Sequence, residues 1–340
     1  MTEPPSPLTM LFSRHTRRRE FISLLGGAAV LYPLTLVAQP SPAARITIIG
    51  VLAPPSFTAV EGLREGFNEL GYVEGQNLRL EYRWAEGPIE QYANSVSELI
   101  QLGAAVIVTY GTPAALAAQR TTATIPIVMA AIGDPVGSGV VPNLARPGGN
   151  ITGFTSIVSD LEVKRLEILK EMLPRLSRVG MLWNSANPAV VPAAAAVRQA
   201  AKEMRLFVDG VEVREKREFE PAFQRWRQNR PDAALVLADP FFLDNALQIL
   251  AFMADQRMPA VYSHRELAVA GGLISYGPNY RELFRRAAGY VDKILKGTKP
   301  GDLPVQQPER FALLINLNTA KKLGLEIPPM LLARADEVIE

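Results

Sequence analysis

Over most of its length the chain alternates short β-branched runs with segments of helical periodicity, and this alternation constrains the fold more than any other feature. Residues 46–52 read Ile-Thr-Ile-Ile-Gly-Val-Leu, which is typical of a buried parallel strand. Apolar residues then recur at helical spacing, at Val60, Leu63, Phe67 and Leu70. Strands that alternate with helices of this length predict α/β architecture, with parallel sheets covered by helices on both faces.

The same alternation continues to residue 262 and divides into two runs. We expect strands at residues 46–52, 78–84, 104–109, 125–131, 178–183, 206–213, 233–238 and 260–262. We expect helices at residues 60–70, 89–102, 113–120, 161–173, 190–204, 218–228 and 241–256. The pattern restarts after residue 155, beyond the Gly/Pro-rich residues 146–150, and so predicts two lobes of similar design.

The N-terminal segment follows a different pattern, in which a basic patch precedes an apolar run, which is followed by a polar segment rich in proline. This order is typical of an export signal rather than of a folded part. Arg18 and Arg19, followed by Phe21 and Ile22, resemble a twin-arginine leader, which directs folded proteins across the bacterial inner membrane.

We therefore expect residues 1–43 to be an export signal that is cleaved near residues 38–44, and the mature protein to act in the periplasm. The apolar residues 21–38 are also long enough to span a membrane, so a retained anchor is the alternative.

The sequence contains no cysteine and two histidines, which excludes several kinds of site. A lipid-modified cysteine, a disulfide, a thiolate nucleophile and a cysteine metal site are all impossible. Since His15 belongs to the leader, a zinc site or a Ser-His-Asp triad would have to be built around His264. We expect His264 to be an ordinary surface or loop residue, and we expect no metal, cofactor or catalytic residue.

Charge argues against a nucleic-acid partner. The whole chain has a formal net charge of +2, and the first 38 residues account for all of it, with four arginines against two glutamates. The rest of the chain is neutral, whereas nucleic-acid binders usually have a basic excess or stripe. The glycine-rich residues 133–139 match neither a dinucleotide-binding nor a Walker loop, because the spacing and the lysine are missing.

Ligands of open α/β sheets bind at the carboxyl ends of the strands, so the loops there contain the candidate site. Gly111 permits a tight turn, Thr112 is a good N-cap, and Pro113 suits the first helical position. The amides of that helix start could bind a ligand carboxylate, with Ser56 in support, or the turn could simply cap its helix.

Acidic and amide side chains follow other strands. Asp134 and Asp239 each precede a proline, and each could pair with a ligand ammonium group or cap the next turn. We expect these two to face the cleft from opposite lobes. Asn184 and Asn187 could bind the ligand or only shape an Asx-turn.

Three aromatic residues lie near strand ends, namely Phe57, Trp84 and Tyr276. Their rings could stack on a flat ligand or only pack against the core.

Several long, ordered motifs identify a family resemblance. They are residues 134–139 (Asp-Pro-Val-Gly-Ser-Gly), 144–153 (Leu-Ala-Arg-Pro-Gly-Gly-Asn-Ile-Thr-Gly), 271–277 (Gly-Gly-Leu-Ile-Ser-Tyr-Gly) and 323–328 (Leu-Gly-Leu-Glu-Ile-Pro). With these motifs the chain resembles, over residues 46–340, the uncharacterised ABC-transporter substrate-binding protein family that is related to tryptophan- and tyrosine-binding lipoproteins.

The resemblance implies a type I periplasmic-binding-protein fold, in which two doubly wound parallel-sheet lobes are joined by three crossovers and enclose a ligand cleft. We expect one lobe at residues 44–155 plus about 272–302, and the other at residues 156–271 plus about 303–340. Because the lipid-anchored cysteine of the lipoproteins is missing, we expect a freely diffusing form.

The function implied by the resemblance is that of the solute-binding protein of an ABC importer. Such a protein would be a monomer that captures a small molecule, here an amino acid and possibly an aromatic one, and delivers it to a permease of the inner membrane. A periplasmic enzyme that uses Asp134 and Asp239 is the alternative, although no nucleophile elbow or acid/base pattern supports it. A ligand-sensing domain for a signalling partner is a further alternative.

Overall fold

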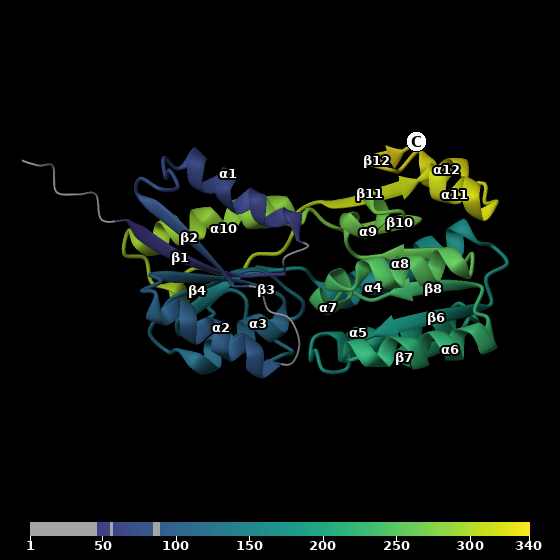
Figure 1. The fold of residues 1–340 in the computed structure, drawn as a ribbon, viewed down its shortest axis with the longest axis horizontal. Helices are drawn as coiled ribbons and strands as arrows, with labels where there is room; N and C mark the ends of the chain where they lie inside the picture. The colour runs from purple at the N-terminus through teal and green to yellow at the C-terminus, as the bar shows by residue number, and fades with distance from the viewer. Residues whose placement is uncertain (1–45, 55–56, 84–88) are drawn as a thin grey trace, which may run out of the picture. The chain divides into compact units, whose positions relative to one another are not determined.

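The β-branched runs of the first half of the chain build a five-stranded parallel sheet in the computed structural model, which describes residues 46–54, 57–83 and 89–340 (Figure 1). The sheet has the order β2-β1-β3-β4-β5. Its strands are β1 (Thr47–Leu52), β2 (Leu78–Arg83), β3 (Val106–Tyr110), β4 (Ile127–Ile132) and β5 (Ile151–Thr155). Every residue of β3, β4 and β5 is buried, as expected for strands that are covered on both faces.

Helices α1 (Glu61–Glu69), α2 (Ile89–Gln101) and α3 (Thr112–Thr121) connect these strands, together with the 3₁₀ turn Thr58–Val60. Helix α1 shows the predicted pattern, because Leu63 and Phe67 are buried one turn apart while its polar residues face outward.

The second sheet has seven strands in the order β12-β11-β10-β9-β8-β6-β7. Its pairs are parallel except β10 with β11, which is antiparallel. Its strands are β6 (Arg178–Trp183), β7 (Phe207–Glu212), β8 (Ala233–Val236), β9 (Ala260–Tyr262), β10 (Ile274–Pro278), β11 (Phe311–Asn316) and β12 (Glu337–Ile339).

The helices around the second sheet follow the same alternation as those of the first. They are α4 (Val158–Met172), α5 (Val190–Glu203), α6 (Phe219–Asn229), α7 (Pro240–Asp244), α8 (Ala246–Asp255), α9 (Arg265–Val269), α11 (Leu317–Leu323) and α12 (Pro329–Leu332). The described elements also include two 3₁₀ turns, Lys216–Glu218 and Pro300–Asp302.

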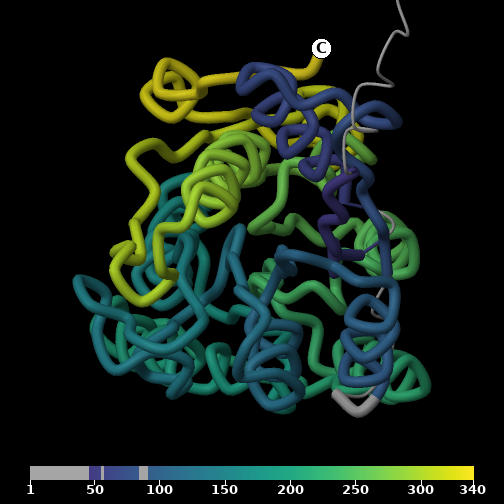
Figure 2. Tube along the Cα trace, turned by 90° about the vertical axis from the view of Figure 1, so that its left-hand side faces the viewer, coloured from purple at the N-terminus to yellow at the C-terminus, as the bar shows by residue number. Residues whose placement is uncertain are grey.

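Helix α10 (Tyr280–Leu295) returns the chain to the first sheet after β10. It packs against α1, β4 and β5, although it follows a strand of the second sheet (Figures 1 and 2). The chain then runs beside β5, where the Thr155 amide donates to the Gln306 carbonyl at 2.9 Å, before it enters β11. The chain thus crosses between the sheets after β5, after β10 and before β11.

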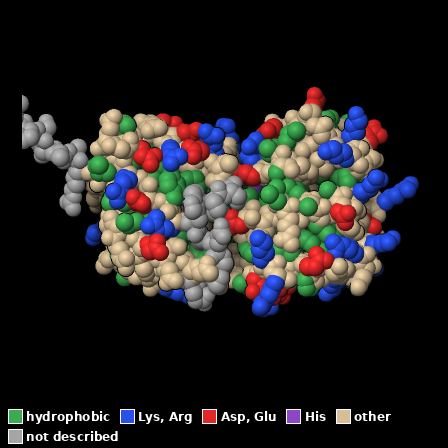
Figure 3. Space-filling view, viewed as in Figure 1, with side chains coloured by type: hydrophobic (Ala, Val, Ile, Leu, Met, Phe, Trp, Pro, Cys, Tyr) green, Lys and Arg blue, Asp and Glu red, His purple; other side chains and the backbone are tan. Residues whose placement is uncertain are grey.

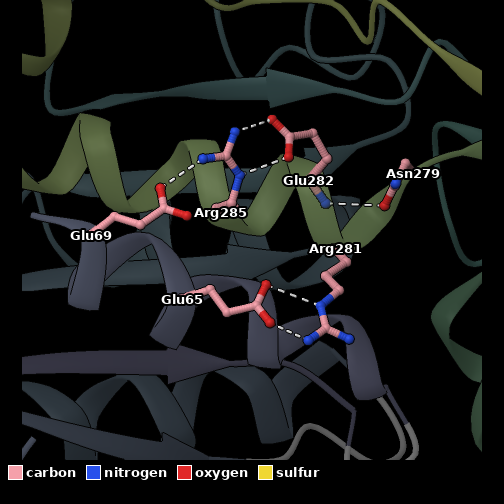
Figure 4. Close-up of polar contacts among 6 residues, drawn as sticks. All are labelled: Glu65, Glu69, Asn279, Arg281, Glu282 and Arg285. Atoms are coloured by element: carbon pink, nitrogen blue, oxygen red, sulfur yellow. Dashed lines mark hydrogen bonds and ion pairs between the residues drawn. The ribbon is translucent and has the colours of Figure 1, made fainter.

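The contact between α1 and α10 is unusually close. A Cβ atom at Gly62 or Gly66 would overlap the carbonyl oxygens of Arg281 and Arg285, so both positions need glycine. Figure 4 shows the charged groups beside this contact, in which Arg281 pairs with Glu65 and Arg285 pairs with Glu69 in the same four-residue register. Small residues therefore set the distance between the helices, and ion pairs match their register.

The structure confirms the predicted strands and helices up to residue 262, with shifts of a few residues, apart from one helix. Residues 241–256 form two helices, because Asn245 leaves helical geometry and its side-chain amide donates to the Phe241 carbonyl at 2.8 Å. Strand β5 and the elements after residue 263 were not predicted. Strand β10 lies in the second sheet, so the return to the first begins with α10 rather than at about residue 272.

The predicted export signal lies outside the described residues. Within them, no helix combines the length and the apolar character that a membrane span requires. On the face shown in Figure 3, basic and acidic side chains are interspersed rather than gathered by sign.

Candidate functional site

The carboxyl ends of strands from both sheets meet around a cavity of about 20 Å³. Gly111 and Thr112 follow β3, Gly133 follows β4, and Asp239 and Pro240 follow β8. A volume of this size accommodates about one water molecule. Residues that follow strands of both sheets line this cavity, which lies at the place where α/β folds bind their ligands.

The turn between β3 and α3 contributes one wall of this cleft. Gly111 has a φ angle of 81° and is the N-cap of α3, so the prediction that Thr112 is the cap is wrong. The Thr112 hydroxyl instead accepts a hydrogen bond from the Gly133 amide at 3.3 Å and so ties the turn to the end of β4. The start of α3, a ten-residue helix, lines the cavity, and the partial positive charge of a helix N-terminus therefore lies there.

Gly111 also touches the opposite wall. A Cβ at this position would lie 2.5 Å from Pro240 Cγ, which is shorter than any normal contact. The two lobes therefore meet here with only the glycine backbone between them.

Asp239 supplies a buried carboxyl group to the cleft, with only 2% of the residue exposed. Its Oδ2 accepts from the side-chain amides of Asn187 at 2.9 Å and Asn184 at 3.4 Å, and its Oδ1 accepts from the Phe241 amide at 2.9 Å. Burial raises the pKa of Asp239 to about 6, while these hydrogen bonds act to lower it. None of the described basic side chains forms an ion pair with Asp239. The site thus keeps a carboxylate that lacks a cation.

The Asx-turn role of the two asparagines is visible, while their ligand-binding role stays a prediction. The Asn184 side-chain oxygen accepts from the Ala186 amide at 2.9 Å, and that of Asn187 accepts from the Ala189 amide at 3.1 Å, as in Asx-turns. The amide nitrogens of the same side chains bind Asp239. Local turn formation therefore orients the two donors that hold the carboxylate.

His264 lies in the short loop between β9 and α9, as one alternative of the prediction had it, but it is only 2% exposed, so the expectation of a surface residue is wrong. It comes from the second lobe and packs among Tyr110, Tyr280 and Phe57, with its ring stacked on Tyr280 at 4.8 Å. One ring nitrogen contacts the Tyr110 hydroxyl, and the other lies 2.6 Å from the Ser263 hydroxyl. Burial lowers the pKa of His264 to about 3, and the charge of Arg165 acts in the same direction. A neutral imidazole therefore joins the two lobes.

The other sequence-predicted residues divide into three groups. Phe57 packs within the same aromatic cluster, with its ring 4.2 Å from that of Tyr110. Asp134 is half-buried and caps a turn, because its Oδ1 accepts from the Gly137 amide at 2.8 Å, and it does not line the cavity. Tyr276 packs against Phe311 and does not line the cavity either. Ser56 and Trp84 lie outside the described residues.

Sequence reasoning missed the buried ion pair of Glu162 and Arg165 on α4, whose side chains are at most 1% exposed. It also missed Ser156 and Val158, which line the cavity after β5. The unpredicted strand β5 was the available signal, because its carboxyl end points to the same cleft. In the part of the chain that is described, no three acidic or histidine side chains gather as metal ligands.

Comparisons with known proteins agree with this architecture. The family model described as ABC transporter substrate binding protein matches residues 45–339. The tyrosine-binding protein of Clostridioides difficile (strain R20291) is 25% identical over 268 residues, which are 79% of this chain and 77% of that protein.

Two solved structures are also similar. A conserved domain protein from Vibrio cholerae has a TM-score of 0.80 and 27% identity, covering 87% of this chain and 99% of that one. An ABC domain from Streptococcus pneumonia in complex with L-Trp has a TM-score of 0.80 and 27% identity, covering 86% of this chain and 100% of that one. Together with the two sheets, these likenesses confirm the predicted type I periplasmic-binding-protein fold.

Proposed function

Since the chain belongs to the ABC transporter substrate-binding protein family, we propose that it binds an amino acid, and foremost an aromatic one, between its two lobes and delivers it to a permease of the inner membrane. The name of the Clostridioides difficile relative and the L-Trp in the Streptococcus pneumonia structure support an aromatic ligand.

The single observation that supports this ligand class most directly is the buried carboxylate of Asp239. Three hydrogen-bond donors hold it, yet none of the described residues supplies it with a cation. A ligand ammonium group would provide that charge. The start of α3 faces the same cleft and offers amides to a carboxylate, so the two walls together suit an α-amino acid zwitterion.

The cavity volume of about 20 Å³ implies motion between the lobes, because small-molecule sites usually need about 300 Å³ or more. We propose that the lobes part to admit the ligand and close when it contacts both walls. Only differential contact with the open and closed states shifts such an equilibrium, and a ligand that bridges Thr112 and Asp239 provides it. The ligand leaves unchanged, and the protein acts as a monomer.

The location follows from the leader. Arg18 and Arg19 precede an apolar run, so we propose export by the twin-arginine route, cleavage of the leader and action in the periplasm. Lysine at both positions should block export. Cell fractionation that finds normal amounts of the double variant in the periplasm would contradict this route.

A thermal-shift screen of amino acids on the purified protein tests the function. A ligand present at 100 times its dissociation constant should add about 2.7 kcal/mol to the free energy of unfolding. At that concentration the same ligand should stabilise Asp239→Asn by only about 0.3–1.3 kcal/mol, as an affinity loss of about 1.5–3 kcal/mol implies. Chromatography should recover the ligand chemically unchanged. A screen in which no amino acid shifts the wild-type protein, or recovery of a converted product, would overturn the proposal.

A further inference from the structure

Glu162 lies directly behind the wall of the cleft. It follows Val158 by one turn of α4, and its Oε1 accepts from the Ala238 amide at 2.6 Å. Val158 and Ala238 both line the cavity, and Ala238 immediately precedes Asp239. Glu162 itself is 0% exposed, so its carboxylate lies beneath the ligand site and not at the surface.

The second oxygen of this carboxylate is unpaired. Within the described residues, Oε2 of Glu162 is buried and has no hydrogen-bond partner. Buried polar atoms are nearly always paired, so each exception requires an explanation. Its neighbour Arg165 does not supply a partner, because its Nη1 lies 2.6 Å from Oε1 and its Nε donates to the Tyr276 carbonyl at 2.6 Å.

Glu162 and Asp239 therefore differ in what they can accept. Arg165 already balances the charge of Glu162, so the free oxygen suits a neutral hydrogen-bond donor rather than a second cation. Asp239 receives no such cation from the described residues and suits an ammonium group. A ligand that presents an ammonium group to one carboxylate and a neutral donor to the other satisfies both.

We propose that Glu162 determines ligand specificity, and that its Oε2 accepts a hydrogen bond from a donor on the ligand's ring, such as a phenol hydroxyl or an indole N–H. This inference rests on the proposed function, since it assumes an aromatic amino acid in the cleft. The protein then selects tyrosine- or tryptophan-like ligands over phenylalanine, because phenylalanine leaves the buried oxygen unpaired.

Calorimetry with matched ligands tests the assignment. We expect the wild-type protein to bind L-tyrosine or L-tryptophan roughly 10- to 100-fold more tightly than L-phenylalanine, as a hydrogen bond to a charged group implies. A methyl group on the donor atom, in O-methyl-L-tyrosine or 1-methyl-L-tryptophan, should remove that advantage. These measurements need no variant, so the absence of a preference overturns the assignment even if a substitution at Glu162 prevents folding.

The variant Glu162→Gln sharpens the test. Its amide oxygen can still accept from the Ala238 amide, while its NH₂ group replaces the free acceptor. The preference for the ring donor should fall to within about threefold, while the affinity for phenylalanine stays near the wild-type value. Glu167→Gln is the matched control on the same helix, because Glu167 is exposed and pairs only with Lys164.

The possible failures are distinguishable. If tyrosine, tryptophan and phenylalanine bind the wild-type protein equally well, the role of Glu162 is overturned and the proposed function stands. Equal losses for all three ligands in Glu162→Gln, or a preference that persists in it, would also overturn that role. If no aromatic amino acid binds the wild-type protein, the aromatic ligand and this inference are overturned together.

Discussion

Two of the contacts that depend on glycine differ in what surrounds them. In the first lobe, Gly62 and Gly66 let α1 approach the carbonyl oxygens of α10. Between the lobes, Gly111 lets the start of α3 approach Pro240. The first contact continues into buried side chains such as Phe67 and Phe284, whereas the second borders a cavity and a buried carboxylate.

Under the proposed function, the first contact stays intact while the second opens and closes. Helix α10 follows a strand of the second sheet, and its contact with α1 attaches this part of the chain to the first lobe. Its ion pairs are largely exposed and add little, so packing carries its stability. The contact at Gly111 lies beside the Asp239 carboxyl, which accepts three hydrogen bonds but forms no ion pair with any described residue. Under the proposed function, a ligand ammonium group supplies the missing charge and favours this contact.

The largest effect is expected from Gly62→Leu. The new side chain would overlap the Arg281 carbonyl and force α10 outward, which should lower the free energy of unfolding by about 3 kcal/mol. Denaturant unfolding measures this loss. Gly289→Ala in α10 is the control, since no atom lies within 4 Å of a Cβ there, and it should be neutral or stabilising. Equal unfolding midpoints for the two variants would show that the helix contact tolerates a side chain.

Asp239→Asn should affect ligand binding and leave the fold intact. Loss of a charged partner for the ammonium group should weaken binding by about 1.5–3 kcal/mol. The free energy of unfolding without ligand should change by less than about 1 kcal/mol, since no ion pair of the described residues is broken. Calorimetry and denaturant unfolding measure the two quantities. An unchanged affinity would remove Asp239 from the ligand site.

Asp239 and His264 should give the protein opposing pH dependences. The folded-state pKa of Asp239 is raised to about 6, so its contribution to stability is greatest at low pH and is lost as pH rises from about 4 to 6. The folded-state pKa of His264 is lowered to about 3, so its contribution is present above pH 6.5 and is lost as pH falls from 6.5 toward 3.

Single variants separate these two contributions. Between pH 4 and 6, Asp239→Asn should lose stability on acidification and His264→Gln should gain it, each by up to about 1.4 kcal/mol per pH unit relative to the wild-type protein. Thermal unfolding across this range provides the measurement. Identical pH profiles for the two variants would contradict the burial of one or both groups in solution.

Gly111→Ala tests the contact between the lobes. Alanine at a φ angle of 81° is strained, and its Cβ would meet Pro240, so closure should become less favourable by about 1–2 kcal/mol. Calorimetry should show this as roughly tenfold weaker binding. Pro240→Ala combined with Gly111→Ala should restore part of the affinity, because Pro240 Cγ is the atom that is approached. No recovery would assign the loss to backbone strain alone.

The smallest effect is expected from Tyr110→Phe. It removes the hydroxyl that contacts His264 across the lobes and keeps the ring, which packs against Phe57. The free energy of unfolding should fall by about 1 kcal/mol. If the variant is as stable as the wild-type protein, the bond across the lobes contributes nothing in solution.

The sequence predicted the parts of the site that follow from chain topology. Thr112, Asn187 and Asp239 line the cavity because the ends of parallel strands meet at one edge of a sheet, and their part in ligand binding stays a prediction. The local sequence pattern alone could not tell residues that line the cavity from similar residues that do not. Asp134-Pro135 and Asp239-Pro240 are the same dipeptide, yet the first caps a half-buried turn and the second lies in the cleft.

Residues whose role depends on burial by distant segments escaped prediction. Glu162 belongs to a helical stretch that also contains Asp160 and Lys164, which is typical of an exposed face. In the structure, the Ala238 amide and the Tyr276 carbonyl contact its ion pair. The scarcity of histidine in the sequence says nothing about the burial of His264. Its surroundings come from Tyr110, Phe57 and Tyr280, which lie on other elements. The antiparallel β10–β11 pair likewise departs from the alternation that guided the prediction.

Hydrogen exchange with and without the bound amino acid tests the contrast between the two glycine contacts most directly. Ligand should slow exchange at residues 111–116 and 239–243, where the lobes meet, and should leave the amides of α1 and α10 unchanged. Equal protection of all four segments, or protection confined to α1 and α10, would contradict a ligand that closes the cleft between two otherwise stable lobes.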